Sequence, residues 1–230
     1  MNDSVARNSL SSAGKVSRTP VAIAKVGIIG AGQMGNGIAQ VCAIAGFNVL
    51  LNDVTEEKIN SGLATIDGNM ARDVSRAHLI EADRKTALSR IHAAKTFEDL
   101  AECDLVIEAA TENEEVKRKI FGRLCSALKP EALLGSNTSS ISITRLASTT
   151  DRPEKFIGIH FMNPVPRMQL VELIRGIATE DATFQAAREL IAKLGKTSTV
   201  AEDFPAFIVN RILLPMINEA IYTLYEGVGS

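Results

Sequence analysis

The 230-residue chain contains no tryptophan and only two tyrosines, and aromatic residues make up 4% of it. Proteins that bind single-stranded nucleic acid stack the bases on aromatic side chains, which are too few here to form such a platform. An excess of one charge is also lacking, because 25 basic residues balance 27 acidic ones and the pI is about 6.0. A balanced surface has no general attraction for nucleic acid or anionic lipid. We therefore expect neither as a partner.

Cysteine and histidine are scarce, with three of each in the chain. Cys42, Cys103 and Cys125 are odd in number and form no Cys-x-x-Cys pair, which indicates buried free thiols of a reducing compartment. We therefore expect a cytoplasmic protein. No histidine lies within five residues of another histidine or of a cysteine, so the sequence predicts no metal site. No apolar run approaches the ~18 residues of a membrane-spanning helix, so we expect no membrane span.

The remaining composition is that of a globular protein, with 46% hydrophobic and 23% charged residues. The length suits one large domain, or one domain and part of another. Residues 1–20 are rich in serine and poor in apolar residues, and we predict a flexible tail over 1–22. The alternative is a transit peptide, because Asp3 is the only acidic residue in that stretch.

Apolar, strand-like segments alternate with helical ones from residue 21 onward. The segments that predict strands are 21–29, 47–53, 91–94, 104–110, 133–137, 155–161, 169–176 and 197–203. The alternation is typical of a Rossmann-like α/β fold with a doubly wound, mostly parallel sheet. The turn between 155–161 and 169–176 is too short for a crossover, so we expect an antiparallel appendage there. A long apolar helix follows, and we divide the chain into a tail (1–22), a cofactor-binding domain (23–205) and the start of a helical domain (206–230).

A glycine-rich segment connects the first predicted strand to the first predicted helix. Gly30, Gly32 and Gly35 fit the pattern Gly-x-Gly-x-x-Gly, and Asp53 ends the next predicted strand. In dinucleotide-binding turns these glycines permit a tight turn, the approach of a pyrophosphate, and close packing of helix on strand. The carboxylate suits free ribose hydroxyls and would repel a 2′-phosphate, so the sequence predicts NAD. The cofactor contacts predicted from this segment are Gly30, Gly32, Gln33, Met34, Gly35 and Asp53.

A histidine and a glutamate lie opposite each other in the predicted hairpin. His160 is near the end of one strand and Glu172 is inside the next, each six residues from Pro166. Cross-strand partners have Cβ atoms about 5 Å apart, and a carboxylate in an apolar strand needs a partner. The pair therefore predicts a carboxylate-oriented imidazole that acts as a general base. The alternative is a structural histidine beside a solvated glutamate.

Polar residues follow the strand at 133–137, at the end where open α/β sheets bind ligands. Asn137 and Ser139 belong to the segment Asn-Thr-Ser-Ser, which either contacts a substrate oxygen or caps the next helix. Asn210 interrupts an apolar run, and it is either a substrate contact or a buried structural asparagine.

Five segments together resemble the L-3-hydroxyacyl-CoA dehydrogenase family, particularly its short-chain 3-hydroxybutyryl-CoA type. They are GAGQMGNGIA, CDLVIEAATE, SNTSSISIT, IGIHFMNPVPRMQLVELIRG and PAFIVNRILLPMINEA, and the resemblance extends from about residue 24 to the end. It implies NAD-dependent oxidation of a short-chain L-3-hydroxyacyl-CoA to the 3-oxoacyl-CoA, and the reverse reaction. It also implies that the helical domain of the family begins near residue 206, that the rest of this domain is absent, and that the full-length form is a homodimer.

The resemblance also implies roles for single residues. His160 is implied as the general base, Glu172 as the group that orients it, and Ser139 as the contact of the 3-oxygen. Asn210 is implied to position the substrate. Further cofactor contacts are implied at Glu112, Lys117 and Asn163. Arg72 and Arg76, four residues apart on one helix face, are candidates for the CoA phosphate, and the alternative is a solvated charged face.

Two other functions remain open from the sequence. One is a non-catalytic NAD-binding protein on the same scaffold, as in crystallin-like relatives. The other is a dehydrogenase of a free β-hydroxy acid, which would need no basic helical arm for CoA.

Overall fold

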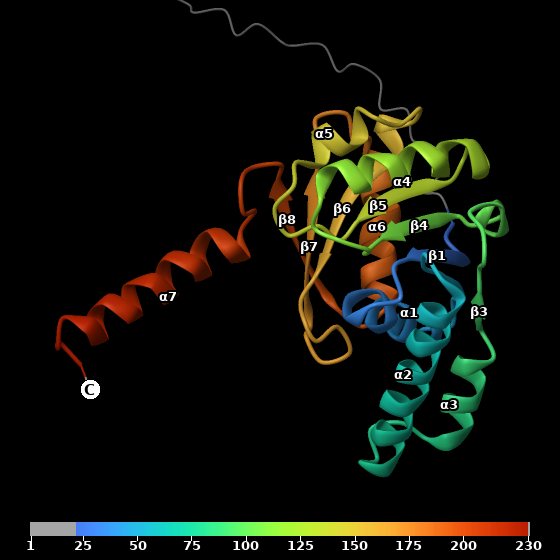
Figure 1. Cartoon of the computed structure of the whole chain (residues 1–230), viewed down its shortest axis with the longest axis horizontal. Coiled ribbons are helices and arrows are strands. Elements are labelled where there is room, and N and C mark those ends of the chain that lie inside the picture. The colour runs from blue at the N-terminus through green and yellow to red at the C-terminus, as the bar shows by residue number, and fades with distance from the viewer. Residues whose placement is uncertain (1–21, 230) are drawn as a thin grey trace, which may run out of the picture.

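An eight-stranded sheet forms the centre of the molecule in this computed structural model, which describes residues 22–229 (Figure 1). The strand order is β3-β2-β1-β4-β5-β6-β7-β8. The strands are β1 (Lys25–Ile29), β2 (Asn48–Asn52), β3 (Ile91–Ala93), β4 (Leu105–Glu108), β5 (Leu133–Ser136), β6 (Phe156–Phe161), β7 (Leu170–Arg175) and β8 (Thr197–Glu202). The tail predicted over 1–22 lies, except for residue 22, outside the described residues.

Helices cover both faces of the sheet. They are α1 (Gln33–Ile44), α2 (Glu56–Ser75), α3 (Glu81–Leu88), α4 (Glu114–Ala127), α5 (Ile143–Ala147), α6 (Asp181–Lys193) and α7 (Val209–Tyr225), with short 3-10 turns η1 (Glu98–Leu100) and η2 (Pro153–Lys155). One apolar cluster joins the sheet to α1, α2 and α6, and a second joins it to α4 and α5. Burial on both faces explains why the parallel strands are continuous apolar runs instead of alternating ones.

The predicted Rossmann-like fold is confirmed, and the hairpin is part of the same sheet. Strand β6 pairs in parallel with β5 and antiparallel with β7, while β8 pairs in parallel with β7. The predicted antiparallel element is confirmed, because β7 runs antiparallel to β6, and β7 and β8 extend the sheet beyond its parallel strands. In the β6–β7 register, His160 lies directly opposite Glu172, as the symmetric placement about Pro166 predicts.

The glycine turn between β1 and α1 is tightly packed at two of its three glycines. Gly30 has a φ of +99°, and a Cβ on it would lie 2.7 Å from the carbonyl oxygen of Ala109. A Cβ on Gly35 would lie 1.7 Å from the carbonyl oxygen of Gly30. A side chain at Gly35 would force α1 away from β1, and one at Gly30 would collide with the segment after β4.

An acidic residue just after β8 connects that strand to α5. The carboxylate of Asp203 accepts hydrogen bonds from Ser142 Oγ (2.7 Å) and from the backbone N–H groups of Ile143 (2.9 Å) and Thr144 (2.8 Å). Burial opposes ionisation of Asp203, but these hydrogen bonds outweigh it and hold its pKa below the usual 3.8. The ionised carboxylate therefore stabilises the folded state.

Replacing Asp203 with Asn is expected to lower the free energy of unfolding by about 1–3 kcal/mol at neutral pH, because one amide oxygen replaces two carboxylate oxygens. The pKa of Asp203 is lower in the folded state, so this stabilisation is present above pH 3.8 and is lost as the pH falls through the folded-state pKa. Denaturant unfolding across this pH range checks the prediction, with the exposed Asp83→Asn as control. Equal stability of D203N and the unmodified protein at neutral pH would contradict it.

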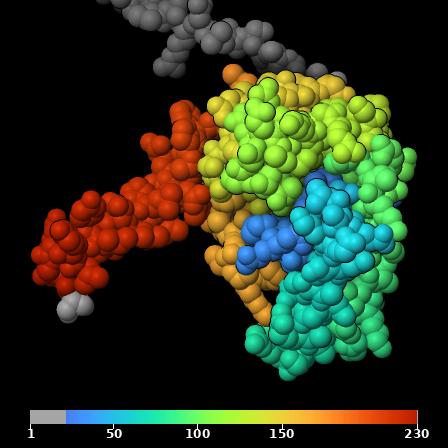
Figure 2. All heavy atoms as spheres, viewed as in Figure 1, coloured from blue at the N-terminus to red at the C-terminus, as the bar shows by residue number. Residues whose placement is uncertain are grey.

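Helix α7 projects from the rest of the molecule as an arm (Figures 1 and 2). None of its residues is buried, and its exposed apolar side chains include Ile212, Leu214, Met216 and Ile221. No helix among residues 22–229 is long and apolar enough to cross a membrane. The three cysteines are free, and two of them are buried as predicted, while Cys125 is half-buried.

Candidate active site

A cavity of about 740 Å³ lies at the carboxyl ends of β1, β4, β5 and β6, with the first turn of α7 as one wall. Open α/β sheets bind their ligands at this edge. The predicted site residues that line the cavity are Gly32, Gln33, Met34, Glu112, Lys117, Asn137, Ser139, His160, Asn163 and Asn210. Residues far apart in the sequence, from Gly32 to Leu213, thus meet in one space.

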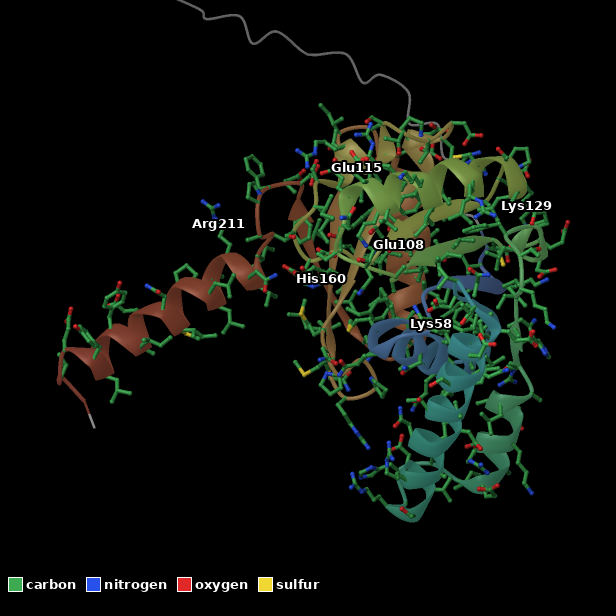
Figure 3. The ribbon with its side chains drawn as sticks, viewed as in Figure 1. Lys58, Glu108, Glu115, Lys129, His160 and Arg211 are labelled. Carbon is green, nitrogen blue, oxygen red and sulfur yellow. The ribbon has the colours of Figure 1, made fainter. Side chains whose placement is uncertain are left out.

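The imidazole of His160 is fixed by a carboxylate from the neighbouring strand. Its Nδ1 lies 2.7 Å from Glu172 Oε2, and the Glu172 side chain is fully buried. Because Nδ1 faces the ionised carboxylate, it carries the proton in the neutral ring, and Nε2 is left as the basic nitrogen. His160 itself lines the cavity (Figure 3). This is the geometry of a general base oriented by an acid.

Glu172 has a second set of partners, which sequence reasoning missed. Its Oε1 accepts hydrogen bonds from the backbone N–H groups of Ile208 and Val209, both at 2.9 Å, where α7 begins. Ala206 and Phe207 precede them with positive φ angles of 68° and 49°, which turn the chain toward the carboxylate. Burial opposes ionisation of Glu172, but the hydrogen bonds from His160 and the two N–H groups lower its pKa below the usual value.

The loop after β5 is organised around the carboxylate of Glu112. Its Oε1 accepts hydrogen bonds from Thr138 Oγ1 (2.6 Å), Ser139 N (2.9 Å), Ser139 Oγ (3.0 Å) and Ser140 Oγ (3.2 Å). Burial opposes ionisation of Glu112, but these donors and nearby Lys117 lower its pKa. Asn137 and Ser139 of this loop line the cavity. The residue that caps α5 is Ser142, not a residue of the Asn-Thr-Ser-Ser segment.

The two asparagines predicted at the site bridge different elements. Asn137 Oδ1 accepts a hydrogen bond from Phe161 N (2.9 Å), which ties the ends of β5 and β6 together beside His160. Asn210 Nδ2 donates to the carbonyl oxygen of Ser139 (3.3 Å), which ties α7 to the serine loop. Asn210 is only half-buried and lines the cavity, so it is not a buried structural asparagine.

The start of α1 fits a diphosphate. Gly32 is the N-cap residue and provides no capping side chain, and a Cβ built on it would meet nothing within 4 Å. The N–H groups of the first turn therefore face open space, where the positive end of the helix favours an anion. Asp53 lies nearby, since its Oδ2 accepts a hydrogen bond from Ala31 N (2.7 Å).

A second cavity, of about 480 Å³, adjoins the first between α1, α2 and the turn after β6. Gly32, Gln33 and Asn163 line both cavities, and Gln33 Nε2 donates to Asn163 Oδ1 (3.0 Å) at their boundary. The wall from α2 is polar, with Ser61, Thr65 and Asn69. An elongated ligand can therefore extend from one cavity into the other.

Two predicted contacts, Arg72 and Arg76, line neither cavity. Both are exposed, Arg72 near the end of α2 and Arg76 directly after it. The guanidinium of Arg72 donates to Asn69 Oδ1, and Asn69 lines the smaller cavity. Arg72 thus contacts a residue of the cavity wall without lining the cavity itself. Arg76 lies one turn farther on, just after the end of α2.

Glu108, at the end of β4, is a site-forming residue that sequence reasoning did not single out. Its carboxylate is fully buried and lies 2.6 Å from the ammonium group of Lys117. Lys117 is 1% exposed, yet it lines the larger cavity. The available signal was an acidic residue in an apolar strand, which requires a buried partner.

Comparisons with known proteins agree with this geometry. A sequence model described as "3-hydroxyacyl-CoA dehydrogenase, NAD binding domain" matches residues 25–204. A 3-hydroxybutyryl-CoA dehydrogenase of Bradyrhizobium diazoefficiens is 71% identical over 208 residues, which are 90% of this chain and 71% of the relative. A probable 3-hydroxybutyryl-CoA dehydrogenase of Deinococcus radiodurans is 50% identical, over 89% of this chain and 73% of the relative. The crystal structure of (S)-3-hydroxybutyryl-CoA dehydrogenase from Ralstonia eutropha superimposes with a TM-score of 0.88 at 48% identity, over 91% of this chain and 74% of that one.

Proposed function

The chain belongs to the 3-hydroxyacyl-CoA dehydrogenase family, and we propose that it interconverts short-chain L-3-hydroxyacyl-CoA, such as 3-hydroxybutyryl-CoA, and 3-oxoacyl-CoA with NAD. The observation that carries the proposal is the 2.7 Å contact between His160 Nδ1 and Glu172 Oε2. His160, Gly32 and Ser139 line the same cavity, which supports a role for the histidine as a base next to the bound cofactor. This cavity can hold a hydroxyl group, its base and the reactive end of a dinucleotide together.

In the proposed oxidation, His160 Nε2 takes the proton of the 3-hydroxyl group. Glu172 stabilises the imidazolium that forms, because its carboxylate faces the protonated Nδ1. Ser139 donates a hydrogen bond to the 3-oxygen as negative charge develops there. The hydroxyl of Ser139 now points to Glu112, so it must turn from that carboxylate to the substrate. Asn210 supports the loop through the Ser139 carbonyl.

The residues proposed to bind NAD come from the β1–α1 turn, from the end of β2, from the segment after β4, from α4 and from the turn after β6. Gly30, Gly32 and Gly35 shape the diphosphate turn, where Gln33 and Met34 contribute the first helical N–H groups. Asp53 is proposed to bind the adenosine ribose. The nicotinamide half of the cofactor is proposed to contact Glu112, Lys117 and Asn163. When bound, NAD supplies the group that accepts the hydride from carbon 3 of the substrate.

Replacing Asp53 with Asn is expected to weaken NADH binding roughly tenfold, because a neutral amide makes weaker hydrogen bonds to the ribose hydroxyls than a carboxylate does. The ratio of NADPH to NADH dissociation constants should fall more than tenfold, because repulsion of a 2′-phosphate is removed. Titration of the nucleotide fluorescence measures both constants, with Asp83→Asn as the matched control. An unchanged ratio would remove Asp53 from cofactor selection.

The acyl-CoA is proposed to extend from the larger cavity along the polar wall of α2. Arg72 and Arg76 are then candidates for its phosphates, since both lie exposed beyond Asn69. The exposed apolar side chains of α7 are proposed to pack against protein in a homodimer. The free thiols suit a reducing compartment, and we propose the cytoplasm.

A spectrophotometric assay with acetoacetyl-CoA and NADH tests the proposed function. We expect CoA-dependent NADH oxidation. A non-catalytic NAD-binding protein would bind NADH without turnover, and a dehydrogenase of a free β-hydroxy acid would oxidise NADH with acetoacetate and ignore the CoA ester. NADH fluorescence separates the first of these outcomes from a protein that binds no cofactor at all.

A further inference from the structure

The last residue of β4, Glu108, is a buried acid that the proposed reaction does not use. Its carboxylate accepts hydrogen bonds from Ala110 N (2.8 Å), Lys117 Nζ (2.6 Å) and Ser136 Oγ (3.0 Å). A fully buried carboxylate is tolerated only where such donors replace its water. The three donors come from the segment after β4, from α4 and from the end of β5, so Glu108 joins the elements that carry the serine loop.

The ammonium group of Lys117 lies between two carboxylates. It is 2.6 Å from Glu108 Oε2 and 3.8 Å from Glu112 Oε2. Coulomb attraction grows as the distance shrinks, so the nearer acid holds the ammonium group. Glu112 can therefore use its other oxygen, Oε1, to accept the hydrogen bonds from Ser139.

We propose that Glu108 is a positioning residue for Ser139. By retaining Lys117, it leaves Glu112 turned toward the serine loop, and so keeps Ser139 beside the cavity where the substrate oxygen binds. A second connection runs through Ser136, whose hydroxyl donates to Glu108 and accepts a hydrogen bond from Thr138 N (3.3 Å). The inference rests on the proposed function, since Ser139 acts in that reaction.

The substitution Glu108→Gln tests this arrangement, because it keeps the size of the side chain and removes its charge. Lys117 then has Glu112 as its only carboxylate partner, and the contacts of Glu112 with Ser139 weaken. We expect kcat to fall by roughly tenfold or more in E108Q. In the Ser139→Ala background the same substitution should cost less than about twofold, because the group that it positions is gone. Losses of equal size in both backgrounds would overturn the proposal.

A matched control is Glu115→Gln, which removes the same charge from an exposed position on α4 (Figure 3). We expect it to leave kcat unchanged. The substitution Glu108→Asp keeps the charge, and it should lose less activity than E108Q even if E108Q folds poorly. Equal losses in E108D and E108Q would overturn the proposal, because the charge would then be irrelevant.

Crystal structures of the unmodified protein and E108Q test the inference without turnover. We expect Glu112 Oε2 to move closer to Lys117 Nζ than the present 3.8 Å, with loss of the hydrogen bond from Ser139 N to Glu112 Oε1. A serine loop that is unchanged in E108Q would overturn the inference. If the unmodified protein fails to oxidise NADH with acetoacetyl-CoA, the proposed function fails, and this structural comparison still decides the placement of Ser139.

Discussion

Replacing His160 with Gln is expected to lower kcat for acetoacetyl-CoA reduction by roughly 10²–10⁴-fold, the usual contribution of a general acid or base. Glutamine can still donate to Glu172 from its amide group, so the β6–β7 pairing and the cavity wall should remain. It cannot exchange a proton with the 3-oxygen, because an amide does not titrate near neutral pH. NADH binding should stay within about twofold of the unmodified protein, since the glycine turn lies on other strands.

The histidine at position 92 provides the matched control, because it is exposed on β3, at the far edge of the sheet. His92→Gln should leave both kcat and NADH binding unchanged. The measurement is the rate of NADH oxidation at saturating acetoacetyl-CoA, together with a fluorescence titration of NADH. Turnover by H160Q at a rate close to that of the unmodified protein would exclude His160 as the base.

The strand partner of His160 could be predicted, because the position of the turn determines which residues pair in a hairpin. Pro166 lies in a turn that is too short for a crossover, so residues at equal distances from it must pair, and His160 and Glu172 do. The glycine turn could also be predicted, because the close backbone contacts at Gly30 and Gly35 require glycine at a fixed spacing. Both features depend on short segments of chain whose geometry is local.

The partners of Glu112 and Glu172 could not be predicted in the same way. Glu172 accepts hydrogen bonds from the N–H groups of Ile208 and Val209, and every non-proline residue has such a group, so the sequence carries no trace of the contact. Glu112 collects donors from a loop 26 to 28 residues away, which depends on how β4 and β5 lie side by side. Long-range side-chain contacts of this kind follow from the assembled sheet.

Replacing Glu172 with Gln is expected to reduce kcat by roughly 10²-fold or more while the fold remains. The amide oxygen of Gln must face the N–H groups of Ile208 and Val209, because the amide nitrogen would repel them. The amide nitrogen then donates to His160 Nδ1, and the ring proton shifts to Nε2. A ring with its proton on Nε2 cannot take the proton of the substrate hydroxyl, so the base is lost although every contact distance is preserved.

The substitution Glu172→Ala separates this effect from the attachment of α7. It leaves His160 Nδ1 and the two N–H groups without an acceptor, which should cost roughly 2–5 kcal/mol of unfolding free energy.

In E172Q the amide hydrogens of Ile208 and Val209 should stay protected from exchange, and in E172A they should exchange rapidly. Nitrogen-15 spectra of the imidazole should report the reversed tautomer in E172Q only. The exposed Glu189→Gln on α6 is the control. Full activity of E172Q would mean that the ring does not depend on this carboxylate for its tautomer, and equal protection in E172A would mean that α7 is attached by other contacts.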